Sequence, residues 1–275
     1  TSEDTINGGE GADTIQGNAG ADQISAGDGD DRSDYTAFTD IFTAAASDSV
    51  DIINGDGGTD RINLNLNTGG ALNTAFTIAN TNTWNRVRGT EIFQTTGTST
   101  GVLSITLSDV ASGAGLNTLD LSSDTEAVGV NVLDVSAETT SGYILNGSAG
   151  VDNVTGGAGA DSVSSGAGVD VIVSGAGTDS INGGAGADVI TAGGGVDVLT
   201  GGADNNQFIF LRTNTLTTDR DNITDGKATD LYDVNTSTGA ALAGSFAGMV
   251  DGNGAASAGI ANAATANSDV AVAIN

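Results

Sequence analysis

The 275-residue chain has no cysteine, no histidine and no proline, and Lys227 is its one lysine. Without cysteine there is no disulfide framework from which to infer a redox compartment. The usual ligands of zinc, copper and iron are also missing. Ser-His and Cys-His nucleophile chemistry is excluded, which leaves only carboxylate-based catalysis open. We therefore expect that the protein is not an enzyme.

Positive charge and long apolar runs are scarce. Lys and Arg number 7 against 35 Asp and Glu, for a formal net charge of −28. Such a chain repels nucleic acid and anionic membranes, so we expect no nucleic-acid partner. Compaction without counterions should be costly, and a divalent cation such as calcium would relieve the repulsion. No apolar run is long enough to span a membrane. The chain begins inside a repeat without a secretory signal, so we interpret it as a fragment of a longer protein.

The abundant feature is a nine-residue repeat with aspartate at its sixth place. Six copies follow one another without insertion from Gly147 to Thr200, reading GSAGVDNVT, GGAGADSVS, SGAGVDVIV, SGAGTDSIN, GGAGADVIT and AGGGVDVLT. An apolar residue stands at the eighth place of every copy. A disordered Gly/Asp-rich linker has no need of this apolar period, so we favour a folded repeat.

Each repeat has two halves with different structural preferences. The first six residues are Gly-rich and predict a tight turn with carbonyls pointing inward. The last three predict a short strand whose middle side chain faces the core. Stacked copies would bury a continuous apolar stripe. Two repeats form one coil, so equivalent turns on one edge are 18 residues apart and a Ca²⁺ ion fits between them.

A shorter repeat block occupies residues 1–34 and continues at Asp51 and Asp60. Ser33 replaces the apolar residue of its third copy, so we expect the apolar stripe to stop there. Apolar residues at helical spacing predict a helical insertion at about 35–47. The predicted metal ligands of both blocks are Asp4, Asp13, Asp22, Asp31, Asp51, Asp60, Asp152, Asp161, Asp170, Asp179, Asp188 and Asp197, with the backbone carbonyls of Gly156, Ala158, Gly183 and Ala185.

Two regions depart from the repeat. Apolar residues alternate with Thr, Asn and Ser in residues 64–146, which predicts a β-solenoid-like segment. Asp120 and Asp134 could bind metal there, but we favour turn or edge positions for them. After Thr200 the pattern decays, with Asn206 in the place of the aspartate. A second short helix is predicted near residues 242–250.

The repeats are similar to the G-G-x-G-x-D-x-U-x repeats of RTX proteins, which bind several Ca²⁺ ions in a parallel β-roll. The resemblance implies an all-β fold, a β-roll or β-solenoid with one or two short helical insertions. Residues 88–96 (RGTEIFQTT) and the later LD-x-S segments more specifically resemble RTX surface-layer proteins. That family is exported by type I secretion from Gram-negative bacteria.

The resemblance implies four regions: a first RTX roll at 1–63, a solenoid-like segment at 64–146, a second roll at 147–210, and a C-terminal cap and secretion-related region at 211–275. It also implies a secreted protein of the cell surface. Its partners would be further copies of itself in a calcium-dependent lattice, the type I secretion machinery, and outer-membrane polysaccharide reached through a part preceding this chain.

Two other functions stay open. The solenoid could be the stalk of an adhesin, with Trp84, Arg86 and Arg88 as a sugar-binding cluster, although we favour Trp84 as a cap on the apolar stripe. The chain could also be the calcium-binding tail of an exported hydrolase. Catalytic residues of such a hydrolase are not found here. Our main hypothesis is a calcium-loaded structural protein of a surface layer.

Overall fold

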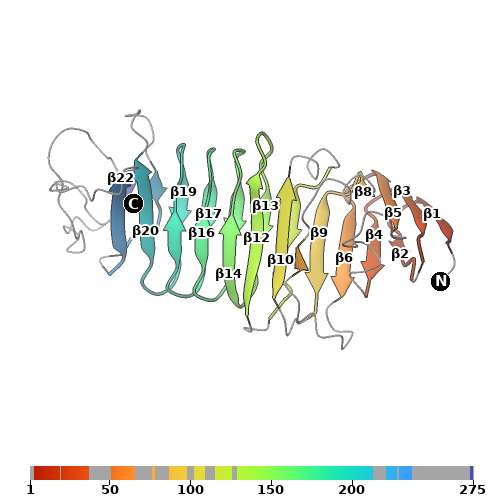
Figure 1. Cartoon of the computed structure of the whole chain (residues 1–275), viewed down its shortest axis with the longest axis horizontal. Helices are drawn as coiled ribbons and strands as arrows, with labels where there is room; N and C mark the ends of the chain where they lie inside the picture. Colours follow the sequence, from red (N-terminus) through yellow and green to blue (C-terminus); the bar gives the residue numbers. More distant parts are fainter. Residues whose placement is uncertain are drawn as a thin grey trace.

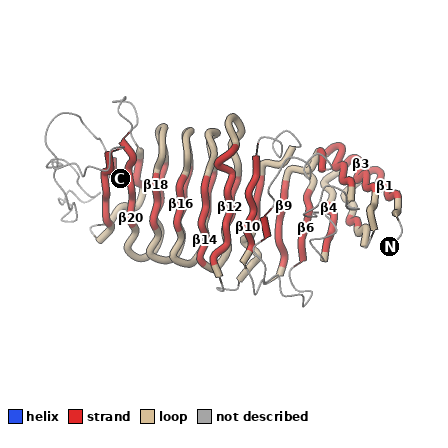
Figure 2. Tube along the Cα trace, viewed as in Figure 1, coloured by secondary structure: helices blue, strands red, loops and turns tan. Residues whose placement is uncertain are grey.

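The computed structural model is an elongated stack of parallel β-strands (Figure 1). It describes residues 3–18, 20–36, 51–65, 76–77, 87–97, 102–108, 115–125, 129–212, 221–227, 229–236 and 273–274. Within these residues all regular structure is β-strand and no helix occurs (Figure 2), so none is available to span a membrane. The prediction of an all-β parallel solenoid is confirmed. The predicted helix near residues 242–250 and most of the predicted helix at about 35–47 lie outside the described residues. The prediction of a helix is wrong for Tyr35, which is the last residue of strand β4.

One side of the stack is a single 11-stranded parallel sheet. Its strands, in spatial order, are β2 (Thr14–Ile15), β4 (Arg32–Tyr35), β6 (Arg61–Asn65), β9 (Ile92–Thr96), β11 (Thr118–Asp120), β13 (Ile144–Asn146), β15 (Ser162–Ser164), β17 (Ser180–Asn182), β19 (Val198–Thr200), β21 (Asn222–Ile223) and β23 (Ala273–Ile274).

The chain alternates between this sheet and two further parallel sheets. The four-stranded sheet contains β1 (Thr5–Glu10), β3 (Gln23–Asp28), β5 (Ile52–Gly57) and β8 (Val87–Arg88). The eight-stranded sheet contains β7 (Phe76–Thr77), β10 (Leu103–Ser108), β12 (Val130–Ala137), β14 (Val151–Thr155), β16 (Val171–Val173), β18 (Val189–Thr191), β20 (Gln207–Arg212) and β22 (Leu231–Thr236).

Strand register confirms that two nine-residue repeats form one coil. Val154 pairs with Ile172 and Ile172 with Ile190 in the eight-stranded sheet. Val163 pairs in the same way with Ile181 in the 11-stranded sheet. Each pair joins residues 18 apart in the chain, so every eighth-place side chain lies directly above its counterpart one coil earlier.

These eighth-place side chains form the core between the sheets. In the C-terminal half all of them are at most 2% exposed: Val154, Val163, Ile172, Ile181, Ile190, Leu199, Phe208, Ile223 and Tyr232. Burial of one such aliphatic side chain stabilises a fold by about 1.5–3 kcal/mol. A three-residue strand can therefore be stable only when coils stack above and below it.

The N-terminal coils accommodate an insertion without losing register. The backbone N–H of Asp22 donates to Asp51 Oδ1 at 2.8 Å across a separation of 29 residues, where the regular coil has 18. The sequence predicted that the apolar stripe ends at Ser33, and this prediction is wrong. Ser33 is 4% exposed in β4 and pairs with Ile62 of β6, so the core column continues across one small polar side chain.

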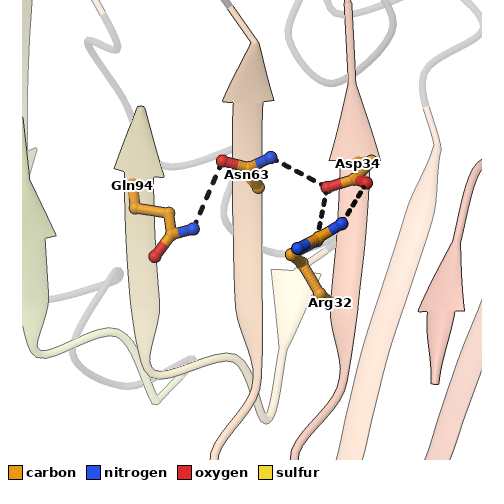
Figure 3. A network of polar contacts seen from close by, with 4 residues as sticks. All are labelled: Arg32, Asp34, Asn63 and Gln94. Carbon is orange, nitrogen blue, oxygen red and sulfur yellow. Dashed lines mark hydrogen bonds and ion pairs between the residues drawn. The ribbon is translucent and has the colours of Figure 1, made fainter. Parts of the chain in front are cut away.

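The outer face of the 11-stranded sheet carries polar side chains in register. Asp34, Asn63 and Gln94 occupy successive strands, and Figure 3 shows them linked in a row. Asp34 accepts hydrogen bonds from Arg32 and from Asn63 Nδ2, and Asn63 Oδ1 accepts from Gln94 Nε2 at 3.3 Å. The Arg32–Asp34 ion pair is partly exposed, so it contributes at most about 1 kcal/mol.

Candidate metal sites

The sixth-place aspartates lie at the two long edges of the stack, where each turn enters a strand. We call the turns that lead into the four- and eight-stranded sheets the first edge. The turns that lead into the 11-stranded sheet form the second edge. The first edge carries Asp4, Asp22, Asp51, Asp152, Asp170 and Asp188; the second edge carries Asp13, Asp31, Asp60, Asp161, Asp179 and Asp197.

On each edge these carboxylates form a ladder of hydrogen bonds from coil to coil. Oδ1 of Asp170 accepts the backbone N–H of Asp152 at 2.9 Å, and Oδ1 of Asp188 accepts that of Asp170 at 3.0 Å. On the second edge Asp179 and Asp197 accept in the same way. The N-terminal coils repeat the arrangement from Asp4 to Asp51 and from Asp13 to Asp60. One carboxylate oxygen of each of these acceptor aspartates therefore fixes the preceding coil.

The second oxygen of most of these aspartates is buried and accepts no hydrogen bond within the described residues. This holds for Oδ2 of Asp13, Asp22, Asp31, Asp60, Asp170, Asp179, Asp188 and Asp197. A buried carboxylate oxygen without a partner is costly unless a cation approaches it. The repeated orphan oxygen therefore fits a ladder of bound Ca²⁺ ions, which prefer oxygen ligands.

Of the four remaining predicted aspartates, Asp51 accepts the N–H of Asp22 through Oδ1, and the other three differ in detail. Asp152 accepts hydrogen bonds from the backbone N–H and the hydroxyl of Ser148. Asp161 accepts from the N–H of Tyr143 through Oδ1 and from that of Gly157 through Oδ2. Asp4 lies at the exposed N-terminal end of the first edge. These three carboxylates thus have less need of a bound cation than the aspartates with an orphan oxygen.

Burial raises the pKa of the ladder carboxylates. Loss of hydration raises the pKa of Asp152 and of Asp170 from 3.8 to about 6. For Asp197 burial is again the main cause, and the charges of Asp221 and Asp179 add to it, so its pKa rises to about 7. Burial also raises the pKa of Asp60 to about 6. Without metal these edges therefore resist ionisation near neutral pH.

The glycines of each turn create the space for this arrangement. A Cβ on Gly156 or Gly183, at the first place, would lie 2.6 or 2.5 Å from Oδ2 of Asp161 or Asp188. At the fourth place Gly186 has φ +126°, and its Cβ would lie 1.5 Å from the carbonyl oxygen of Gly168. Serine or alanine stands at the first place of three other copies between Gly147 and Thr200, so a small side chain is tolerated there, whereas a side chain at the fourth place would displace the neighbouring coil.

Backbone carbonyls must complete any calcium site. Among the described residues no group of three or more acidic side chains converges on one point. Of the four predicted carbonyls, that of Gly183 accepts the Ser165 hydroxyl at 2.5 Å and that of Ala185 accepts the N–H of Gly168 at 2.8 Å. Gly156 and Ala158 occupy the corresponding places of the turn before β15. A carbonyl has two lone pairs, so an existing hydrogen bond leaves one for a metal ion.

The ladders include three acidic residues that the sequence analysis missed. Glu91 accepts the N–H of Asp60, Asp221 that of Asp197, and Asp230 that of Asn206. Each stands two places before a buried aromatic or aliphatic residue, namely Phe93, Ile223 and Tyr232 in the same order. The spacing of an acidic residue two places before an apolar one could have identified them from the sequence. They were not predicted because the Gly-rich turn of the repeat is missing before them.

Other candidate residues have different positions. Asp120 is the last residue of β11 and Asp134 lies within β12, and their carboxylates accept the N–H groups of Ser122 and Ser136. Asp120 thus has the favoured edge position, whereas Asp134 is in a strand rather than in a turn. Arg88 is exposed in β8, whereas Trp84 and Arg86 lie outside the described residues.

A comparison with protein-family models agrees with this geometry. Residues 1–32, 43–67, 146–181 and 173–208 match the RTX calcium-binding nonapeptide repeat, in four copies. A search of curated proteins finds no match. The chain therefore contains RTX repeats, and these repeats bind Ca²⁺. RTX repeats are typical of proteins secreted by Gram-negative bacteria.

Proposed function

We propose that this chain is a structural, calcium-loaded part of a bacterial surface layer. The observation that carries the proposal is the pair of carboxylate ladders along an elongated stack. In this arrangement Ca²⁺ is a component of the fold rather than a reagent, because the orphan oxygens recur coil after coil and belong to no single cleft. The more specific sequence resemblance to RTX surface-layer proteins supports the same function.

Calcium would couple folding to export. Extracellular calcium modules bind with dissociation constants of roughly 10⁻⁴–10⁻³ M, so a calcium-poor cytosol leaves such modules empty. The empty chain carries a net charge of −28 and buried carboxylates with raised pKa values, which oppose folding at neutral pH. We propose that the type I secretion machinery exports this unfolded chain and that extracellular calcium then folds it.

The partner in the lattice would be further copies of the chain. Aliphatic side chains are exposed on both broad faces: Val171 and Leu231 on the eight-stranded sheet are 42% and 41% exposed, and Ile144 on the 11-stranded sheet is 47% exposed. Bound calcium lowers the like-charge repulsion between copies and rigidifies the stack, so less ordering entropy opposes association. Outer-membrane polysaccharide would anchor the lattice through another part of the protein.

Electron microscopy and light scattering with and without calcium test the proposal. Millimolar CaCl₂ added to the purified chain should produce planar arrays, and excess chelator should dissolve them. MgCl₂ at equal ionic strength is the control for charge screening. A calcium-loaded protein that stays monomeric at high concentration would refute the lattice and favour the adhesin or the exported-hydrolase tail.

A further inference from the structure

One turn of the first edge departs from the regular turns that end in Asp170 and Asp188. The turn of residues 201–206 has Asn206 in the place of the ladder aspartate, and Asn206 Oδ1 accepts the N–H of Asp188 at 2.9 Å. Its Nδ2 atom takes the place of the orphan oxygen, since a Cβ on Gly201 would lie 2.5 Å from it. Nδ2 donates to the carbonyl of Ala203 at 3.1 Å. This position therefore offers an N–H donor where the turns of Asp170 and Asp188 offer an orphan carboxylate oxygen.

The same turn holds the ammonium group of the chain's one lysine. Lys227 Nζ donates to the carbonyl of Asp204 at 2.9 Å and also to the carbonyl of Gly202. Lys227 belongs to the next coil of the same edge, at the third place of its turn. A positive charge thus binds two backbone oxygens of the turn that lacks the carboxylate.

The backbone conformation of this turn also differs from that of the preceding calcium turn. In the preceding turn of this edge, the fourth place is Gly186 with φ +126° and no room for a Cβ. The fourth place here is Asp204, with φ +56°. Aspartate adopts this left-handed conformation more readily than most residues. The turn therefore differs from the preceding one in its backbone conformation as well as in its sixth-place side chain.

The stack nevertheless continues past this turn with regular geometry. Asp230 accepts the N–H of Asn206 at 2.9 Å, and both oxygens of Asp225 accept from the N–H groups of Gly201 and Gly202. In the core Tyr232 stacks on Phe208, with ring centroids 5.6 Å apart and planes 9° from parallel. The altered turn is therefore an interior position of the first edge.

The second edge of the same region has no such cation among its described residues. Asp197 keeps its orphan oxygen and is followed in the ladder by another acid, Asp221. At this level of the stack the two edges thus differ in chemistry: the first edge has an amide with an ammonium, and the second edge has two carboxylates.

We propose that the Lys227 ammonium is a tethered cation that replaces Ca²⁺ on the first edge at Asn206. The ammonium donates hydrogen bonds to two carbonyl oxygens and repels a divalent ion, and Asn206 has no carboxylate that could bind one. The calcium ladder of this edge therefore ends at Asp188, whereas on the second edge it continues to Asp197 and Asp221. The inference depends on calcium binding by the repeats and is independent of lattice assembly.

Calorimetric titration of the full chain with CaCl₂ tests this assignment. N206D/K227M restores the carboxylate and removes the ammonium, so it should bind one more Ca²⁺ per chain than the unmodified protein. N206D alone should bind no additional ion, because Lys227 neutralises the new carboxylate. N205D/K227M is the matched control: it places the charge on exposed Asn205, one residue away, and should gain no ion.

Thermal unfolding in saturating calcium gives a second measurement. K227M alone should lower the melting temperature, and adding N206D should restore it in calcium but not in chelator. The proposal is overturned if N206D/K227M binds the same number of ions as the unmodified protein, or if it fails to fold in calcium. A gain of one ion by K227M alone would equally contradict it, since Asn206 would then have no excluding role. The titration of the unmodified protein shows separately whether the repeats bind calcium.

Discussion

Replacing Asp170 by asparagine should have opposite effects on stability with and without calcium. Asp170 is fully buried, its Oδ1 accepts the N–H of Asp152, and its Oδ2 is an orphan. Asn206 shows that the fold accepts an asparagine at this place, with Oδ1 keeping the ladder bond and Nδ2 donating to the carbonyl three residues earlier. D170N therefore removes a charge and a metal ligand while it keeps the coil-to-coil hydrogen bond.

The size of the effect without metal can be worked out from the pKa. Burial and the neighbouring charge of Asp188 raise the pKa of Asp170 from 3.8 to about 6. One pKa unit corresponds to about 1.4 kcal/mol, so ionised Asp170 costs the metal-free fold about 3 kcal/mol at pH 7. D170N should stabilise the metal-free fold by up to this amount. In calcium it should destabilise the fold, since a site at 100 times its Kd contributes about 2.7 kcal/mol that the variant loses.

Far-UV circular dichroism can measure both signs. In excess chelator the folded fraction would be followed as trimethylamine oxide, which favours compact states, is added. In millimolar calcium the free energy of unfolding would come from urea titration. D134N is the matched control, because Asp134 lies in β12 outside the ladders and its Oδ1 can still accept the N–H of Ser136. It should change neither result by more than about 0.5 kcal/mol.

A change in unfolding free energy of the same sign in chelator and in calcium would refute this reasoning. If D170N destabilised the protein equally in chelator and in calcium, the carboxylate would stabilise the fold by hydrogen bonding alone. Stabilisation under both conditions would mean that Oδ2 is not a calcium ligand.

Three further predictions concern pH, turn glycines and the core. The pKa values of Asp152, Asp170 and Asp197 are raised in the fold, so the metal-free protein should be most stable below about pH 4 and should lose stability as the pH rises to about 7. Saturating calcium should abolish this loss, and a chelated protein whose circular dichroism does not change over this range would contradict the prediction. G186A should destabilise the calcium-loaded protein by more than about 2 kcal/mol, because its Cβ overlaps the Gly168 carbonyl, whereas G194A meets no atom within 4 Å and should be near neutral by urea titration. I181A removes a side chain 1% exposed and should cost about 2–5 kcal/mol, whereas I144A, at a position 47% exposed, should cost less than about 1 kcal/mol; equal costs would argue against the observed strand facing.

Much of the fold could be predicted because its determinants are local. The apolar eighth place and the Gly-rich turn recur every nine residues, so the strand, the turn and the 18-residue register arise from one repeat and the need to bury it. The same reasoning located the twelve sixth-place aspartates on the two edges. It failed at Ser33 and Tyr35, because one small polar residue in a stacked column costs less than breaking the stack, and because helical spacing over a short segment does not exclude a strand.

The sequence alone therefore determined the coil: its length, its buried stripe and the carboxylate at each turn. The tertiary structure decided how the coils continue where the repeat becomes irregular. It brings Glu91, Asp221 and Asp230 into the ladders across coils of unequal length, since register depends on pairing with the coil below and not on spacing along the chain. It also places the Lys227 ammonium on the carbonyls of Gly202 and Asp204, more than 20 residues away. Such contacts between coils depend on side-chain reach and backbone direction, which a one-dimensional period does not contain.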